Sequence, residues 1–179
     1  MAPELSSARL ALRPAGLDDL AAVHGLWTEP SVRRFLFDDR TLGADEVLGF
    51  LARSEASFRT RGFGLWLGFE GRDPAIAAFA ALLPQEAPGA PPSLIYGVRP
   101  AGTGRGLATE TARAVLAHAF GALALPRVHA DVDAPNAASV RVLEKLGMVR
   151  AGERVGAWGD PLLDFTLDAA AFRAGEEKR

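Results

Sequence analysis

The feature that most restricts the fold of this chain is a run of three alternating glycines, Gly102, Gly104 and Gly106, between a strand pattern and a helix pattern. Residues 93–98 have the pattern of a strand, and residues 106–121 carry apolar side chains at helical intervals. Residues without side chains let several backbone N–H groups converge on an anion, and a helix N-terminus attracts negative charge. The pattern predicts a phosphate- or pyrophosphate-binding turn, although a flexible loop that needs positive φ angles would use the same glycines.

Two common phosphate-binding motifs do not match this turn. A P-loop requires Lys and then Ser or Thr after its last glycine, whereas Leu107 and Ala108 follow Gly106. A dinucleotide-binding fingerprint that starts at Gly102 meets Leu107 where Gly or Ala belongs, and the turn lies in mid-chain behind a hairpin pattern. A nucleotide-dependent enzyme is therefore disfavoured.

The remaining periodicity predicts a single domain over residues 1–179 with a mixed sheet. Strand patterns cover 9–13, 63–70, 75–83, 93–98 and 127–132, with a final strand pair within 153–167. Helix patterns begin at Asp18-Asp19 and cover 44–60, 106–121 and 137–146, the last ended by Gly147. Because consecutive strands precede the middle helix, the sheet is expected to be mixed rather than doubly wound and parallel.

The composition excludes several classes of function. Without cysteine, the chain has no disulfide, no thiolate metal site and no cysteine-acyl intermediate. Its three histidines lack paired ligand spacing, so no metal is expected, and a net charge of −2 argues against a nucleic-acid partner. The N-terminus has no signal-peptide pattern, and the apolar run 75–83 is far shorter than the roughly 20 residues that span a bilayer. We therefore expect a cytoplasmic chain without a membrane partner.

Two segments resemble motifs of the GNAT superfamily of N-acetyltransferases. Residues 103–108 (TGRGLA) are similar to its pyrophosphate motif Q/R-x-x-G-x-G/A, although Thr103 replaces the initial Gln or Arg. Residues 104–110 (GRGLATE) are close to the G-K-G-x-A-T-E of the branch that resembles ribosomal-protein alanine N-acetyltransferases. Residues 136–148 are similar to the family's N-x-x-S-x-x-x-x-x-K-x-G-F/M, and the opening RLALRP also agrees. The resemblance covers almost the whole chain.

This resemblance implies an α/β fold with an α+β mixed sheet, mostly antiparallel and flanked by about four helices. The sheet would splay between its fourth and fifth strands, 93–98 and 127–132. It implies transfer of acetyl from acetyl-CoA, without a metal, to a primary amine that attacks directly in a ternary complex. The amine would belong to a small molecule or a protein N-terminus, and whether the chain forms a homodimer stays open. The alternative is a non-catalytic acyl-CoA-binding or sensor protein.

The resemblance also assigns cofactor-binding residues. The backbone of Val98 would pair with the pantetheine arm as an added strand does. Asn136 and Ser139, which begin the following helix, would contact pantetheine near the thioester sulfur, although such residues also cap helices. The pyrophosphate would be held by the backbone of the glycine turn and helix start, that is by Thr103, Gly104, Arg105, Gly106, Leu107, Ala108 and Thr109.

The catalytic assignments rest on the proton that the amine must lose. An alkyl ammonium has a pKa of about 10.4 and a peptide α-ammonium one of about 7.7–8, so a base is needed. Asp131 is the first candidate and His129 the second, and strand alternation places both on one face with Asp133. The same residues would also suit a solvated cleft without a catalytic role.

The departing sulfur raises a separate question. Leu143 stands where many family members carry a tyrosine as general acid. Either Ser139 therefore acts on the sulfur or the chain has no dedicated acid. Tyr96, the only tyrosine, is predicted to be structural or to line the substrate site.

The acceptor side is expected to be formed by the helical segment 24–40 and the loop 84–92. Four aromatic residues, Trp27, Phe35, Phe37 and Trp66, would line this side or belong to the core. Trp158 is a further candidate.

Overall fold

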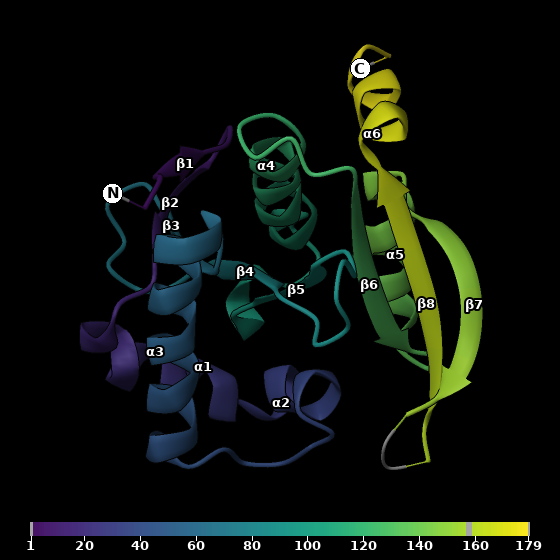
Figure 1. Cartoon of the computed structure of the whole chain (residues 1–179). Helices are drawn as coiled ribbons and strands as arrows, with labels where there is room; N and C mark the ends of the chain where they lie inside the picture. Colours follow the sequence, from purple (N-terminus) through teal and green to yellow (C-terminus); the bar gives the residue numbers. More distant parts are fainter. Residues whose placement is uncertain (1, 157–158, 179) are drawn as a thin grey trace.

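Eight strands form one mixed sheet in the computed structural model, which describes residues 2–156 and 159–178 (Figure 1). Their spatial order is β1-β2-β3-β4-β5-β6-β8-β7, and every neighbouring pair is antiparallel except β5–β6. The strands are β1 (Leu5–Ser6), β2 (Leu10–Pro14), β3 (Leu65–Glu70), β4 (Ala78–Leu83), β5 (Ser93–Val98), β6 (Arg127–Asp133), β7 (Val149–Val155) and β8 (Pro161–Asp168).

Helices cover both faces of the first half of this sheet. Within the described residues there are six α-helices and two short 3-10 turns. They are η1 (Leu17–Asp19), α1 (Leu20–Thr28), α2 (Pro30–Leu36), α3 (Ala44–Arg61), η2 (Pro100–Gly102), α4 (Leu107–Phe120), α5 (Ala137–Leu146) and α6 (Ala169–Glu176). None of them combines the length and apolar character needed to cross a membrane.

Strand β4 separates two hydrophobic cores, which explains its unbroken apolar sequence. Ala78, Ala80 and Leu82 face a core that includes residues of α4 and α5. Phe79 and Ala81 face the other core, which includes residues of α1 and α3. Because side chains alternate along a strand and both faces are covered, polar residues have no place in β4.

The sheet splays between β5 and β6, as the resemblance implies. The two parallel strands share one register pair, Ser93 with His129, and the N–H of His129 donates to the carbonyl oxygen of Pro92 at 2.9 Å. Beyond this point β6 pairs along its whole length with β8, so β6, β8 and β7 diverge from β5 (Figure 1). The edge of β5 that faces β6 is therefore open from Leu94 to Val98.

The structure adds elements that the periodicity did not separate. The expected first helix is divided at Glu29, which has a ψ angle of 128°, because the residue before a proline disfavours helical geometry. Pro30 then begins α2. Helix α6 and the short strand β1 were not predicted, and the final strand pair begins at Val149 rather than 153. The mixed, mostly antiparallel sheet itself is confirmed.

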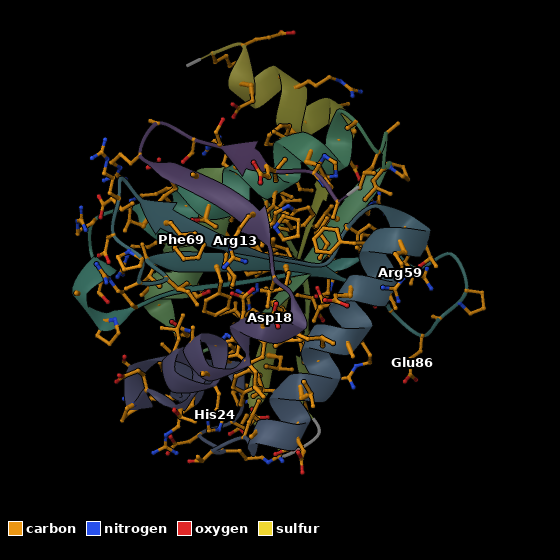
Figure 2. The ribbon with its side chains drawn as sticks, turned by 90° about the vertical axis from the view of Figure 1, so that its left-hand side faces the viewer. Arg13, Asp18, His24, Arg59, Phe69 and Glu86 are labelled. Atoms are coloured by element: carbon orange, nitrogen blue, oxygen red, sulfur yellow. The ribbon has the colours of Figure 1, made fainter. Side chains whose placement is uncertain are left out.

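The entry to α1 is held by charge pairing. Arg13, the penultimate residue of β2, forms an ion pair with Asp19 at 2.6 Å. Its guanidinium also lies over the ring of Phe69 in β3, 5.0 Å from the ring centroid (Figure 2). The pairing keeps the pKa of Asp19 below its usual range. These contacts fix the start of the helical segment relative to the sheet.

Candidate functional site

The glycine turn follows β5 directly and has the backbone geometry that only glycine adopts readily. Gly104 has φ of +78°, and Gly106, the N-cap of α4, has φ of +79°. A side chain at either position would strain the backbone because both φ angles lie in the left-handed region. The glycines therefore bring the main chain around the start of α4 without side chains covering it.

Five backbone N–H groups at this turn have no acceptor within the part of the chain that the structure describes. They belong to Gly104, Gly106, Leu107, Ala108 and Thr109. The last three are the orphan donors of a helix start, and no side chain in the described part of the chain caps them. Such donors, together with the dipole of a 14-residue helix, form a cradle for an anion.

A cleft of about 710 Å³ lies beside this cradle, between the diverging strands β5 and β6. Helix α2 contributes to its wall, and so do the starts of α4 and α5. The cleft gathers most of the residues named from the sequence, namely Val98, Thr103, Gly104, Gly106, Leu107, Ala108, Thr109, Asp131, Asn136 and Ser139.

Two of the named residues do not line the cleft. Arg105 turns away and forms an ion pair with Glu70 at 2.5 Å, and its N–H donates to the carbonyl oxygen of Gly102 at 3.4 Å. His129 lies where β5 and β6 still pair. Its Nε2 bonds to Asp164 Oδ1 at 3.1 Å, while its Nδ1 is buried without a hydrogen-bond partner among the described residues. Neither nitrogen of His129 is therefore presented to the cleft.

Helix α5 begins with a cap that leaves part of Asn136 available. The Oδ1 atom of Asn136 accepts the N–H of Ser139 at 3.1 Å, so the capping role is confirmed. The side-chain nitrogen of Asn136 forms no hydrogen bond with another described residue, so this donor remains available to a ligand in the cleft. Capping and ligand binding are thus compatible at this position.

The hydroxyl of Ser139 has a partner on the opposite wall. Its Oγ lies 2.6 Å from the hydroxyl oxygen of Tyr96, a β5 residue that also lines the cleft. The Tyr96 hydroxyl additionally reaches the carbonyl oxygen of Ser139 at 3.0 Å. Burial raises the pKa of Tyr96 to about 12. The phenol is therefore a neutral hydrogen-bonding group under ordinary conditions.

Asp131 belongs to a chain of charged contacts at the rim of the cleft. Its Oδ2 accepts a hydrogen bond from Arg154 of β7, and Arg154 Nε donates to Asp164 Oδ1 at 3.0 Å. Asp131 and Asp164 are direct register partners in β6 and β8. Because opposed like charges destabilise an antiparallel pair, Arg154 offsets the repulsion between them.

Asp133 is the second carboxylate of β6 in the cleft and differs from Asp131. It forms no ion pair with another described residue. Burial raises its pKa, and the negative charges of Asp38, Asp160 and Asp131 raise it further. Asp133 therefore holds a proton more readily than an ordinary aspartate.

Leu143 and the aromatic residues are distributed between core and cleft. Leu143 is 1% exposed within the core, so its side chain offers nothing to the cleft. Trp27 and Trp66 are fully buried, and Phe37 packs against the second core. Phe35 of α2 lines the cleft, whereas Trp158 lies outside the described residues. Of the four aromatics, Phe35 is thus the one that lines the cleft, and its contact with the acceptor stays a prediction.

The loop 84–92 is not part of this cleft. It lines a separate hollow of about 790 Å³ with Arg61, Arg127 and Asp168. Glu86 lies on the outer side of the loop, away from the sheet (Figure 2). The loop therefore does not line the cleft, and its role on the acceptor side stays a prediction.

Sequence reasoning missed several charged residues in or next to the cleft. Arg154 contacts Asp131 and Asp164, and Asp164 contacts His129, in each case across strands. The sequence could not predict these contacts because they depend on strand register. Asp38 and Asp160 come from loops that the fold brings to the rim. Among the described residues no group of three or more acidic or histidine side chains is arranged to hold a metal.

Comparisons with known proteins agree with this geometry. Residues 9–149 match the family model described as an acetyltransferase (GNAT) domain. Among solved structures, a GNAT-family acetyltransferase from Bacillus anthracis is 17% identical with a TM-score of 0.78, over 94% of this chain and 99% of that one.

Two similar structures contain a ligand. RimL, a ribosomal L7/L12 α-N-protein acetyltransferase in complex with coenzyme A, is 17% identical with a TM-score of 0.80, over 94% of this chain and 99% of that one. The yncA structure from Salmonella typhimurium, with its cofactor acetyl-CoA, is 20% identical with a TM-score of 0.73, over 90% of this chain and 95% of that one. At these identities the likeness shows a shared fold.

Proposed function

The chain belongs to the acetyltransferase (GNAT) family, and we propose that it transfers acetyl from acetyl-CoA to the nitrogen of a primary amine. The observation that carries this proposal is the cradle of unpaired N–H groups next to the open edge of β5. The cradle suits a pyrophosphate, and the open strand edge suits an extended arm with amide groups. Coenzyme A combines these two parts in one molecule.

The residues present fit coenzyme A in detail. The five N–H groups at Gly104, Gly106 and residues 107–109 would bind the pyrophosphate oxygens. The backbone near Val98 would pair with the pantetheine amides, because no strand of the described chain occupies that edge. The side-chain nitrogen of Asn136 would donate to the same arm. Thr103 lines the cleft, and Arg105 would contribute by holding the turn to Glu70.

The reaction we propose is direct attack in a ternary complex. The lone pair of the amine forms a bond to the acetyl carbonyl carbon, and the bond from that carbon to sulfur breaks. Because the chain has no cysteine, an acyl-cysteine intermediate does not arise. A thiol has a pKa of about 8.5, so its thiolate leaves readily and the base matters more than an acid.

We assign the base to the carboxylate pair of Asp131 and Asp133. Both line the cleft, whereas the nitrogens of His129 are bonded to Asp164 or buried. Arg154 occupies Oδ2 of Asp131, while the raised pKa of Asp133 makes Asp133 a better proton acceptor than an ordinary aspartate. The two carboxylates would receive the proton of the ammonium directly or through water.

The acceptor is a primary amine of a small molecule or of a protein N-terminus. A positively charged acceptor would be favoured next to the carboxylates of Asp38, Asp133 and Asp160, in a cleft that Arg141, Lys145 and Arg154 also line. RimL acts on a protein α-amine, which supports a protein N-terminus as one candidate class. A cytoplasmic location and a homodimer stay predictions.

The test is incubation with acetyl-CoA and a panel of amines, with free thiol release as the readout. The panel contains short peptides with different N-terminal residues and small mono- and diamines. We expect release to depend on an amine and N-acetylated product to match the thiol in amount. Tight binding of acetyl-CoA without release for any amine would contradict catalysis and support the acyl-CoA-binding alternative.

A further inference from the structure

Tyr96 and Ser139 form a hydroxyl pair that the family resemblance did not assign. Tyr96 lies on β5, two residues before Val98 and therefore on the same face of the strand. Ser139 lies in the first turn of α5. Their oxygens are 2.6 Å apart, and both residues line the cleft beside the proposed pantetheine path. The pair thus bridges the wall of the cleft from the strand to the helix.

The pair has two possible proton arrangements, because a phenol carries one proton. In the first, Tyr96 donates to the carbonyl oxygen of Ser139 at 3.0 Å, and the serine hydroxyl donates to Tyr96. In the second, Tyr96 donates to Oγ of Ser139, which leaves the serine proton to be donated into the cleft. A small rotation of two hydroxyl protons interconverts them, and a nearby negative charge favours the second.

We propose that Tyr96 is a positioning residue for acetyl transfer, which donates to Oγ of Ser139 so that the serine hydroxyl donates to the departing sulfur. The inference rests on the proposed function. In this chain, α5 carries the buried Leu143 where many family members have a tyrosine. The hydroxyl pair would provide the group that stabilises the departing sulfur. The required hydroxyl comes from the neighbouring strand and acts through Ser139.

The pKa values of the two groups indicate that Tyr96 orients Ser139 and does not transfer its own proton to the sulfur. The pKa of Tyr96 is raised to about 12 by burial, whereas a thiol has a pKa of about 8.5. Transfer of the tyrosine proton to the thiolate would therefore be unfavourable. A hydrogen bond from a neutral hydroxyl to a developing thiolate has no such barrier, and bonds to charged groups are the stronger ones.

The electron and proton balance is simple. The nitrogen–carbon bond forms, the carbon–sulfur bond breaks, and its electron pair stays on sulfur. The amine proton passes to the carboxylate pair of Asp131 and Asp133 and then to water. The sulfur leaves as a thiolate that is held by Ser139 and takes a proton from water after release. Tyr96 and Ser139 keep their own protons throughout.

Coenzyme A itself supplies a test that needs no acceptor. The chain has no cysteine, so the thiolate absorbance of its complex with coenzyme A arises from the ligand alone. Tyr96 is the only tyrosine, and its high pKa keeps phenolate absorbance out of the titration. The bound thiol is titrated in the wild type, Tyr96→Phe, Ser139→Ala and the double variant. Thr60→Val is the matched control, because it removes a hydroxyl of α3 that donates to the carbonyl oxygen of Ala56, and neither residue lines the cleft.

We expect the bound thiol to titrate about one pH unit higher in Tyr96→Phe than in the wild type, which is a tenfold loss of preference for the thiolate. Ser139→Ala should give a shift of similar size, and the double variant should add nothing to it. Thr60→Val should match the wild type. In turnover, Tyr96→Phe should lower kcat about tenfold, the size of one lost hydrogen bond, with KM for acetyl-CoA within about twofold.

Two results would overturn the inference while leaving the proposed function intact. One is a bound thiol whose pKa in Tyr96→Phe equals that of the wild type, while the pKa in Ser139→Ala is shifted. The other is a double variant whose shift is the sum of the single shifts, because Tyr96 would then act without Ser139. A wild-type protein that does not bind coenzyme A would instead contradict the proposed function, and the inference would fall with it.

Discussion

Gly106→Glu is the sharpest test of the anion cradle, because it places a carboxylate at the N-cap of α4. Gly106 is exposed, and a Cβ at this position would have Arg9 Nη2 at 3.8 Å as its nearest neighbour. The side chain therefore fits sterically in the free protein. Its φ of +79° strains any residue other than glycine by about 1–2 kcal/mol. We expect a folded variant whose melting temperature is lower by roughly 2–8 °C.

The loss of affinity for coenzyme A follows from Coulomb's law. Two unit charges of like sign repel by about 4 kcal/mol at 4 Å and about 2 kcal/mol at 8 Å, with an effective dielectric constant near 20. The side chain is flexible, so the larger distance is the conservative choice. At about 1.4 kcal/mol for each tenfold change, the dissociation constant should rise between roughly 30-fold and 1,000-fold. Isothermal titration calorimetry with coenzyme A measures it, and added salt should reduce the effect.

Two further variants separate charge from strain. Gly106→Ala has the same backbone strain without the charge, so it should bind coenzyme A better than Gly106→Glu. Gly89→Glu carries the same charge at a φ of +75° in the loop 84–92, where its Cβ has no neighbour within 4 Å. It should bind coenzyme A like the wild type. Wild-type affinity in folded Gly106→Glu would refute the placement of the pyrophosphate, and equal losses in both Glu variants would refute a local effect.

Further predictions concern the carboxylates and the packing of β5. Asp133→Asn should lower kcat by about 10²-fold and Asp131→Asn by less. Both losses should shrink at high pH, where the free amine is already deprotonated, and steady-state rates measured against pH test this. A wild-type rate in both variants would show that neither carboxylate is the base. Asp133→Asn should also raise the melting temperature at neutral pH, because the raised pKa of Asp133 means that its charged form costs folded-state stability. That gain should vanish below the ordinary carboxyl pKa of about 3.9, and a gain that persists there would contradict the electrostatic cause. Gly97→Ala should destabilise the fold by about 1–3 kcal/mol, measured by denaturant unfolding. The reason is that the new Cβ would lie 2.5 Å from the ring of Phe79, which is fully buried. An unchanged free energy of unfolding would show that this ring can move.

The sequence alone determined the parts of this protein that depend on local geometry. The glycines of the turn were readable because residues with positive φ have few alternatives to glycine, as Gly104 and Gly106 show. Gly147, with φ of +83°, ends α5 as predicted for the same reason. The strands and the longer helices followed from their apolar periods, and the splay from a family resemblance that spans both flanking motifs. Apart from the splay, each of these features is encoded within a short window of residues.

Only the tertiary structure decided which side chains meet. Tyr96 and Ser139 are 43 residues apart and touch because β5 and the start of α5 face each other across the splay. Asp131 meets Arg154 because of the register of β6, β8 and β7, and a shift by one residue would turn these side chains to the other face. The loop 84–92 lines a hollow separate from the cleft, which its composition could not predict because composition indicates exposure but not direction. Contacts between distant segments depend on register and packing, which a sequence pattern of period two or 3.6 leaves undetermined.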